Sequence, residues 1–246
     1  YHDKISQIFS KNNVKVVAAR NAALPKQGQL NYIVMLYGKE PWLGNIYNDY
    51  PGAYEQAAVN FEKGDGLVFC LLEGSLDDVT KSKNEIREII GVGKRSLHTT
   101  DTPEEVIRNT YTAFHMNTLA FLTYAKTGYF NSPVFSSFIE ETKNIMEMNQ
   151  MDTEDFCVGG SATLAAYGIR ECKDFDIVHT SPDAYLKFYP HGLENILHHP
   201  KNHIYIDGIK FLSMENTIGF KNNRGEDKDV KDVNLARQYA EELGLV

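Results

Sequence analysis

The chain has 246 residues, of which 42% are hydrophobic and 24% are charged, which is the composition of a folded protein rather than of a disordered segment. Its formal net charge of −8 argues against general electrostatic binding to DNA or RNA, because such binding depends on many lysine and arginine contacts with phosphates. The three cysteines are too few and too scattered for a disulfide framework, and we expect all three to be buried thiols in a reducing compartment.

No apolar run approaches the roughly 18 residues that a membrane span needs, and residues 1–13 lack the apolar core of a signal peptide. We therefore expect a cytoplasmic protein without a membrane partner. The sequence begins without Met and directly in an expected helix, so we also expect a segment to precede it.

The spacing of apolar residues predicts alternating helices and strands in the first half of the chain. Residues 14–19 and 66–72 are continuous apolar runs of strand length. Ser75, followed by two acids, is a typical capping residue and predicts a helix to about Ile90. Shorter helices are expected around residues 5–9, 30–37, 42–47 and 54–60.

Thr102 and Pro103 form a strong helix start, because a capping hydroxyl precedes a proline at the first helical position. We expect this helix to run to about Lys126. A turn-rich segment over residues 128–133 then separates it from an amphipathic helix over residues 136–148. The predicted organisation is a first domain over residues 1–128, a linker helix over residues 129–149 and a second domain over residues 150–246.

The second domain has an α/β layer pattern and carries the chemically most informative residues. Its expected elements are a helix over residues 161–167, a strand over 175–178, a hairpin over 203–211 and a final helix over 230–243. Before the first of these, Gly159, Gly160 and Ser161 offer backbone N–H groups and a hydroxyl that phosphate oxygens can approach without hindrance. We interpret this turn as a phosphate cradle.

Asp174 and Asp176 alternate on the expected strand, so both carboxylates are predicted to lie on one face of it. Two such carboxylates can share a hard divalent cation, and Mg²⁺ prefers carboxylate and phosphate oxygens. A bound metal could activate an attacking hydroxyl and stabilise a leaving pyrophosphate. The other interpretation is an exposed strand edge with acidic turn residues.

Residues 158–178, VGGSATLAAYGIRECKDFDIV, resemble the nucleotidyltransferase superfamily, whose signature is a Gly-Gly or Gly-Ser turn, a short helix and an Asp-x-Asp strand. The segment is similar to the tRNA nucleotidyltransferases and closer to the nucleotidyltransferases of abortive-infection toxin systems. The resemblance extends over residues 150–240. It implies a nucleotidyltransferase fold, with Mg²⁺ or Mn²⁺ as cofactor and a nucleoside triphosphate as substrate.

Residues 211–233 resemble the C-terminal block of the same superfamily. By that resemblance Lys221 would contact nucleotide phosphates, while Lys228, Asp229 and Asp232 would organise the last helix. Many active members place a third carboxylate on a neighbouring strand, and Asp207 is the candidate here. Its position before Gly208 equally suits a tight hairpin turn, so the third metal ligand stays open.

Residues 92–105, VGKRSLHTTDTPEE, resemble the phospho-accepting motif of nucleoside diphosphate kinases, and the ungapped alignment places the accepting histidine on His98. The similarity covers most of residues 3–116 and implies a ferredoxin-like fold, with Arg87 as a phosphate ligand. The sequence departs from the motif at Arg95 and Thr99, and the glutamate that would orient the histidine falls on Asn109. A structural histidine beside the helix cap is the alternative for His98.

These patterns predict a mixed α+β protein, with an N-terminal ferredoxin-like domain of the nucleoside diphosphate kinase type and a C-terminal nucleotidyltransferase-fold domain. The leading hypothesis is Mg²⁺-dependent transfer of a nucleotidyl or related phosphate-linked group to an unknown acceptor. The alternatives are phosphotransfer through His98 and a non-catalytic nucleotide-binding regulatory module. Relatives of the first domain usually assemble through it, so a homo-oligomer is compatible with the resemblance.

Overall fold

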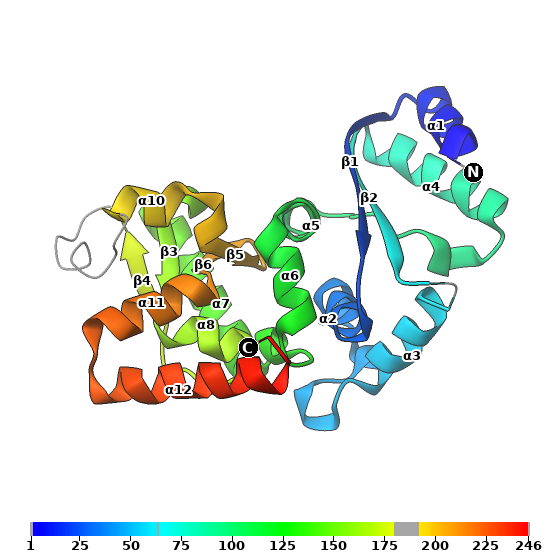
Figure 1. The fold of residues 1–246 in the computed structure, drawn as a ribbon. Helices are drawn as coiled ribbons and strands as arrows, with labels where there is room; N and C mark the ends of the chain where they lie inside the picture. Colours follow the sequence, from blue (N-terminus) through cyan, green and yellow to red (C-terminus); the bar gives the residue numbers. More distant parts are fainter. Residues whose placement is uncertain (1, 63, 180–191, 246) are drawn as a thin grey trace.

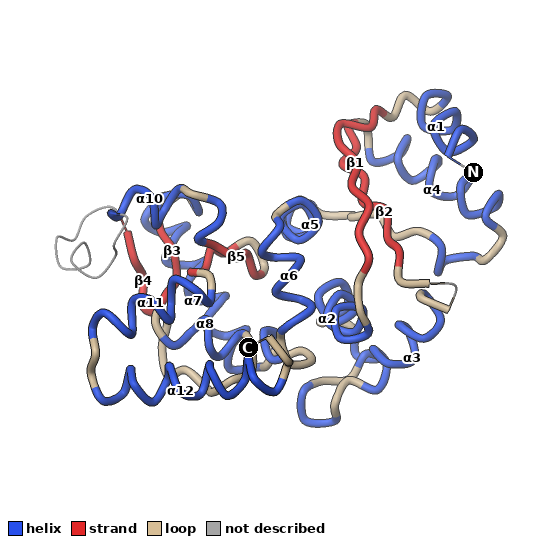
Figure 2. The backbone as a smooth tube through the Cα atoms, in the orientation of Figure 1, coloured by secondary structure: helices blue, strands red, loops and turns tan. Residues whose placement is uncertain are grey.

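The computed structural model describes residues 2–62, 64–179 and 192–245, and it is a mixed α and β structure with two small sheets. Figure 1 shows the smaller sheet in one half of the molecule and the larger sheet in the other, with helices between them. The expected α+β class is therefore confirmed. The tube in Figure 2 shows that helices make up most of the described backbone.

The smaller sheet is an antiparallel pair of strands, β1 (Lys15–Ala23) and β2 (Gly66–Glu73). Near one end of this pair lie α1 (His2–Lys11) and α4 (Leu76–Ile90), whose apolar faces form a small core with Ile8, Phe9 and Ile86. Towards the other end lie α2 (Lys26–Tyr37) and α3 (Pro51–Asn60). As the sequence predicts, the Ser75 hydroxyl caps α4 by accepting a hydrogen bond from the N–H of Asp78.

Apart from α2, α3 and two 3-10 helices, which come between the two strands in the chain, the element order of this half is α1, β1, β2, α4. This order matches the middle four elements of the βαββαβ arrangement that defines a ferredoxin-like fold. The outer two strands of that arrangement have no counterpart among the described residues, which form a two-stranded sheet in this half. The nucleoside diphosphate kinase type of fold therefore stays a prediction.

The larger sheet has the strand order β4-β3-β6-β5. The strands are β3 (Phe156–Gly159), β4 (Asp176–His179), β5 (His203–Ile206) and β6 (Ile209–Leu212). The pair β3–β6 is parallel, whereas β3–β4 and β5–β6 are antiparallel, and β5 and β6 form the expected hairpin. Every residue of β3, β5 and β6 is buried, which places these strands inside the molecule.

Helices surround the larger sheet, and α11 and α12 lie side by side on one side of it in Figures 1 and 2. The helices of this half are α7 (Pro133–Asn149), α8 (Ser161–Ala166), α10 (Gly192–His198), α11 (Met214–Arg224) and α12 (Asp227–Glu242). Short 3-10 helices occupy Pro41–Leu43, Ile46–Asn48, Gly93–Ser96, Tyr129–Asn131, Thr153–Asp155 and Pro200–Asn202.

The helix that starts at Pro103 is shorter than the sequence predicts. It ends at Phe114 as α5 (Pro103–Phe114), and α6 (Met116–Tyr124) follows after a single residue. His115 adopts an extended backbone there, and its ring nitrogen Nδ1 accepts a hydrogen bond from the N–H of Thr118, which caps the new helix. The expectation of one continuous helix to Lys126 is wrong because this side-chain cap replaces the helical hydrogen bonds.

The largest hydrophobic core runs across the predicted domain boundary. It joins Ile33 of α2 and Phe121 of α6 to Phe135 of α7 and Phe211 of β6. The division at residues 128 and 150 therefore stays a prediction, and the core itself is continuous across it. The cysteines are free; Cys157 and Cys172 are buried as expected, but Cys70 is exposed, because the two-stranded sheet that carries it leaves alternate positions open.

Candidate functional site

The predicted phosphate cradle lies at the end of β3, where Gly159 leads into Gly160 and the start of α8 at Ser161. Gly160 has φ 65° and ψ −131°, a backbone conformation open essentially to glycine alone. A Cβ atom at residue 160 would lie 2.0 Å from Oδ2 of Asp176. The missing side chain therefore lets the Asp176 carboxylate lie directly against the turn.

Asp176 reaches this position because β4 pairs antiparallel with β3, and its register places Asp176 opposite Gly159. Asp174 lies two residues earlier, in a bend that precedes β4 rather than on the strand itself. Both aspartates are exposed, and neither forms a hydrogen bond or ion pair with another described residue. Two exposed carboxylates without a direct hydrogen bond or ion pair to another described residue thus lie beside β3 and the Gly-Gly-Ser turn.

The structure does not bring Asp207 to this site. Asp207 and Gly208 form the two-residue turn between β5 and β6, and both have positive φ, 49° and 83°, as such hairpin turns require. Since β3 and β6 are parallel, the turn before β6 lies at the opposite end of the sheet from Gly159. The interpretation of Asp207 as a third metal ligand is therefore wrong, and the hairpin interpretation is correct.

Instead of a metal, Asp207 faces two basic side chains. Its carboxylate accepts a hydrogen bond from Arg108 of α5 at 3.3 Å and one from Lys143 of α7 at 2.5 Å. Within the described ranges, no three His, Cys, Asp or Glu side chains are grouped closely enough to hold a metal ion. A metal at the turn after β3 would accordingly rest on Asp174, Asp176 and ligands from outside the protein.

Lys221 is not placed to contact a nucleotide. Its side chain is 3% exposed, and its Nζ lies 2.7 Å from Asp232 and 3.4 Å from Asp229. Both aspartates belong to α12, so the lysine fastens α11 to α12. The resemblance assigned Lys221 to the nucleotide phosphates. It could not show that Asp229 and Asp232 of the same block surround this lysine.

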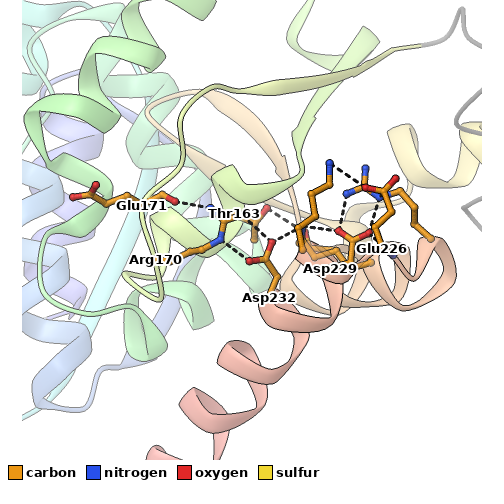
Figure 3. Close-up of polar contacts among 10 residues, drawn as sticks. Thr163, Arg170, Glu171, Glu226, Asp229 and Asp232 are labelled. Carbon is orange, nitrogen blue, oxygen red and sulfur yellow. Dashed lines mark hydrogen bonds and ion pairs between the residues drawn. The ribbon is translucent and has the colours of Figure 1, made fainter.

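Asp229 and Asp232 belong to a buried chain of charges that fixes the helices around the Gly-Gly-Ser turn (Figure 3). Arg170 contacts Asp232 through two hydrogen bonds, at 2.6 and 2.8 Å. Burial raises the pKa of the Asp232 carboxyl, but hydrogen bonds from Arg170 and Lys221 outweigh it and hold that pKa below its usual value. The carboxylate is therefore ionised and locks the loop after α8 to α12.

Arg224 is the basic side chain that the sequence interpretation missed. It holds Asp229 with two hydrogen bonds, at 2.7 and 2.6 Å, and its charge interacts with that of Asp176. Its side chain is 24% exposed, in contrast to the buried Lys221. The sequence did contain a signal for Arg224. This residue comes after Lys221 on the same helix and directly before the capping Gly225, and the last residue of a helix is usually more exposed to solvent than one a turn earlier.

Two threonines hold α8 in place beneath the turn. The hydroxyl of Thr163 donates to the carbonyl of Leu212 on β6 at 3.0 Å, and the hydroxyl of Thr217 on α11 lies 3.2 Å from that of Thr163. Figure 3 shows Thr163 between the loop that carries Arg170 and the charge cluster of α12. The turn is thus positioned by α8, α11 and α12 together.

His98, in the first half, is exposed and lies beside Tyr37 of α2. Its Nδ1 is 3.3 Å from the Tyr37 hydroxyl, and the two rings meet edge to face. Desolvation by its neighbours lowers the pKa of His98, while the charge of Glu105 opposes that shift. Glu105, one helical turn before Asn109, is thus a carboxylate whose charge acts on the histidine.

Arg87 does not reach outward as the expected phosphate ligand. It donates to the backbone carbonyls of Leu97 at 2.7 Å and Lys94 at 3.3 Å, and its buried Nε has no hydrogen-bond partner among the residues that the structure describes. Its contacts fix the loop that ends at His98. The structure thus places Arg87 near the histidine, but as a support for the loop.

No known family model matches the chain, and no curated protein or solved structure matches it significantly. No helix in the described part of the chain combines the length and apolar character needed to cross a membrane. The candidate site is consequently interpreted from its own residues.

Proposed function

We propose that the chain is a Mg²⁺-dependent transferase that moves a nucleotidyl or related phosphate-linked group from a nucleoside triphosphate to an acceptor hydroxyl. The observation that carries this proposal is the contact between Gly160 and Asp176, which sets an exposed carboxylate against a glycine turn at the start of α8. Phosphate oxygens and a metal that bridges them to a carboxylate fit the same place.

The residues present fit a magnesium ion held by few protein ligands. Mg²⁺ is usually bound through one or two carboxylates together with substrate phosphates and water. Asp174 and Asp176 supply two exposed carboxylates that form no ion pair with any other residue in the described part of the chain. The ion would neutralise phosphate charge and activate the acceptor hydroxyl.

The remaining groups at the site bind and orient the substrate. The backbone N–H groups of Gly160 and Ser161, with the Ser161 hydroxyl, would donate hydrogen bonds to phosphate oxygens. Arg224, and not Lys221, would offset the phosphate charge, because Arg224 is partly exposed and Lys221 is buried between two aspartates. Lys221 acts by holding α11 against α12.

Pyrophosphate release tests the proposal without knowledge of the acceptor. Each of the four nucleoside triphosphates is supplied in turn together with a pool of RNA, protein and small hydroxyl acceptors. The unaltered chain should release pyrophosphate with Mg²⁺ and stop when the ion is chelated. Asp176→Asn should abolish release, whereas Asp207→Asn, at the other end of the sheet, should keep it. Full release by Asp176→Asn would overturn the proposal, and tight nucleotide binding without release would favour the non-catalytic alternative.

Phosphotransfer through His98 is the second candidate, and the contact between His98 and Tyr37 favours it. A hydrogen bond between the Tyr37 hydroxyl and Nδ1 would leave Nε2 to accept a phosphoryl group, and Glu105 would support the charged ring. Labelled ATP should then leave an acid-labile phosphohistidine that His98→Ala removes. An unlabelled protein would reject this candidate.

A further inference from the structure

A cavity of about 380 Å³ lies between α2, α5, α6, α7 and the turn after β5. Two of its lining residues, Tyr37 and Glu105, are also neighbours of His98. It includes Ile206 and Asp207 in its wall, so it is at the opposite end of the larger sheet from Gly160. Its size is within the range of pockets that hold small organic molecules. The transfer proposed at Gly160 does not use it, and phosphorylation of His98 would share only the part of its wall that carries Tyr37 and Glu105.

The inner wall of the cavity is apolar and belongs to the main hydrophobic core. Phe121, Leu122, Phe130 and Ile139 line it, and each is less than 10% exposed. These side chains are fixed by the packing of α6 and α7 against the sheet, so the wall is preformed. A ring or a branched aliphatic body suits such a surface.

Carboxylates predominate among the charged residues of the wall. Five acidic residues line the cavity, Glu40, Glu104, Glu105, Glu140 and Asp207, against two basic ones, Lys39 and Arg108. Lys143 and Arg108 neutralise Asp207 by direct contact. The side chains of Glu40 and Glu104 form no hydrogen bond or ion pair with any residue that the structure describes, so a negative charge remains at the cavity.

We propose that this cavity is a binding site for a small organic cation with an apolar, ring-sized body and a protonated amine. The body fills the wall formed by Phe121, Phe130 and Ile139. The amine faces Glu40 and Glu104. An anion of the same size is disfavoured because the carboxylates repel it.

Three phenol probes that differ only in charge test this site: tyramine is a cation, tyrosol is neutral and 4-hydroxyphenylacetate is an anion. Isothermal titration calorimetry of the full chain at low salt should show tyramine binding at least tenfold more tightly than the anion, with tyrosol between them. Equal affinity for the cation and the anion, or no binding of tyramine, would overturn the proposal.

Variants locate the binding within the molecule. The double variant Glu40→Gln and Glu104→Gln changes two exposed side chains, so it should keep the fold and lose about tenfold in tyramine affinity. Glu141→Gln, on the exposed side of α7 and outside the cavity, is the matched control and should keep the affinity. Ser136→Leu should fill the cavity and abolish binding while the melting temperature stays unchanged. Unaltered tyramine binding in both cavity variants would show that the probe binds elsewhere and would overturn the assignment.

Discussion

The carboxylate of Asp176 lies so close to Gly160 that a methyl group on residue 160 would be 2.0 Å from its Oδ2 atom. This contact joins the two parts of the sequence motif, the glycine turn and the acidic strand, which are separated by α8 and the loop after it. The arrangement depends on the antiparallel pairing of β3 with β4, which sets Asp176 opposite Gly159. Any substitution at residue 160 must move the carboxylate, the turn or both.

Gly160→Ala should therefore destabilise the protein and weaken nucleotide binding together. The positive φ and the clash with Asp176 should lower the free energy of unfolding by about 1–3 kcal/mol, as measured by urea denaturation. Gly219→Ala is the control, because Gly219 lies inside α11 with open space around its Cα, and alanine there should stabilise the helix by about 0.5–1 kcal/mol. Equal effects of the two substitutions would contradict the account of the turn.

Lys221→Met should be strongly destabilising, because it leaves the buried Asp229 and Asp232 carboxylates without one of their cations. Removal of one partner from a buried ion pair costs about 3–5 kcal/mol, and Arg170 and Arg224 should reduce that loss to its lower end, about 3 kcal/mol. Lys228→Met, whose side chain is 68% exposed, should change the free energy of unfolding by less than about 0.5 kcal/mol. A nucleotide-binding role without a structural role would instead leave the stability of Lys221→Met unchanged.

His203 should make the stability of the protein pH-dependent below neutrality. Burial lowers the pKa of this histidine to about 4, and its Nε2 donates a hydrogen bond to the carbonyl of Ile196. Between pH about 6.5 and about 4 the unfolded chain binds a proton that the folded chain excludes, so the free energy of unfolding should fall as pH falls, by up to about 1.4 kcal/mol per pH unit. Below the folded pKa this contribution becomes constant.

The variant His203→Gln tests that assignment, because glutamine can donate to Ile196 but does not titrate. Denaturation midpoints measured from pH 7 to pH 4 should vary less in the variant than in the unaltered chain. Parallel pH profiles would show that other groups cause the loss of stability.

His98→Ala should leave the free energy of unfolding within about 0.5 kcal/mol, because the ring is exposed and its one hydrogen bond, to Tyr37, is also at the surface. If His98 accepts phosphate, Tyr37→Phe should lower the rate of labelling without removing it, since the hydroxyl positions the ring. Mass spectrometry after mild alkaline work-up measures both. Equal labelling in His98→Ala would place the modification elsewhere.

Local signals in the sequence predicted the elements whose causes are local. Ser75 and Thr102 accept hydrogen bonds from the first turn of their helices, and the hairpin turn at Asp207 and Gly208 has the positive φ values that its residues favour. The end of α5 at Phe114 was missed because the cap comes from a histidine, a residue whose side chain caps helices less often than Ser, Thr, Asp or Asn.

The candidate site was predictable as a motif but not as an arrangement. Gly160 and Asp176 are close because β3 pairs with β4, which the spacing of the motif alone does not show. The burial of Lys221 depends on contacts between α11 and α12, and the distance of Asp207 from the site depends on the parallel pairing of β3 and β6. These are tertiary relationships, and a single sequence does not contain the strand order that decides them.

Equilibrium binding of nucleoside triphosphates with and without Mg²⁺ tests the central claim most directly. A non-hydrolysable triphosphate analogue should bind the unaltered chain at least tenfold more tightly with Mg²⁺ than with the ion chelated, and Asp207→Asn should behave identically. The double variant Asp174→Asn and Asp176→Asn should lose the Mg²⁺ dependence while its melting temperature stays within a few degrees. Two results would contradict the assignment of the two aspartates as the metal site: Mg²⁺ still tightens analogue binding in this double variant, or Mg²⁺ does not tighten it in the unaltered chain.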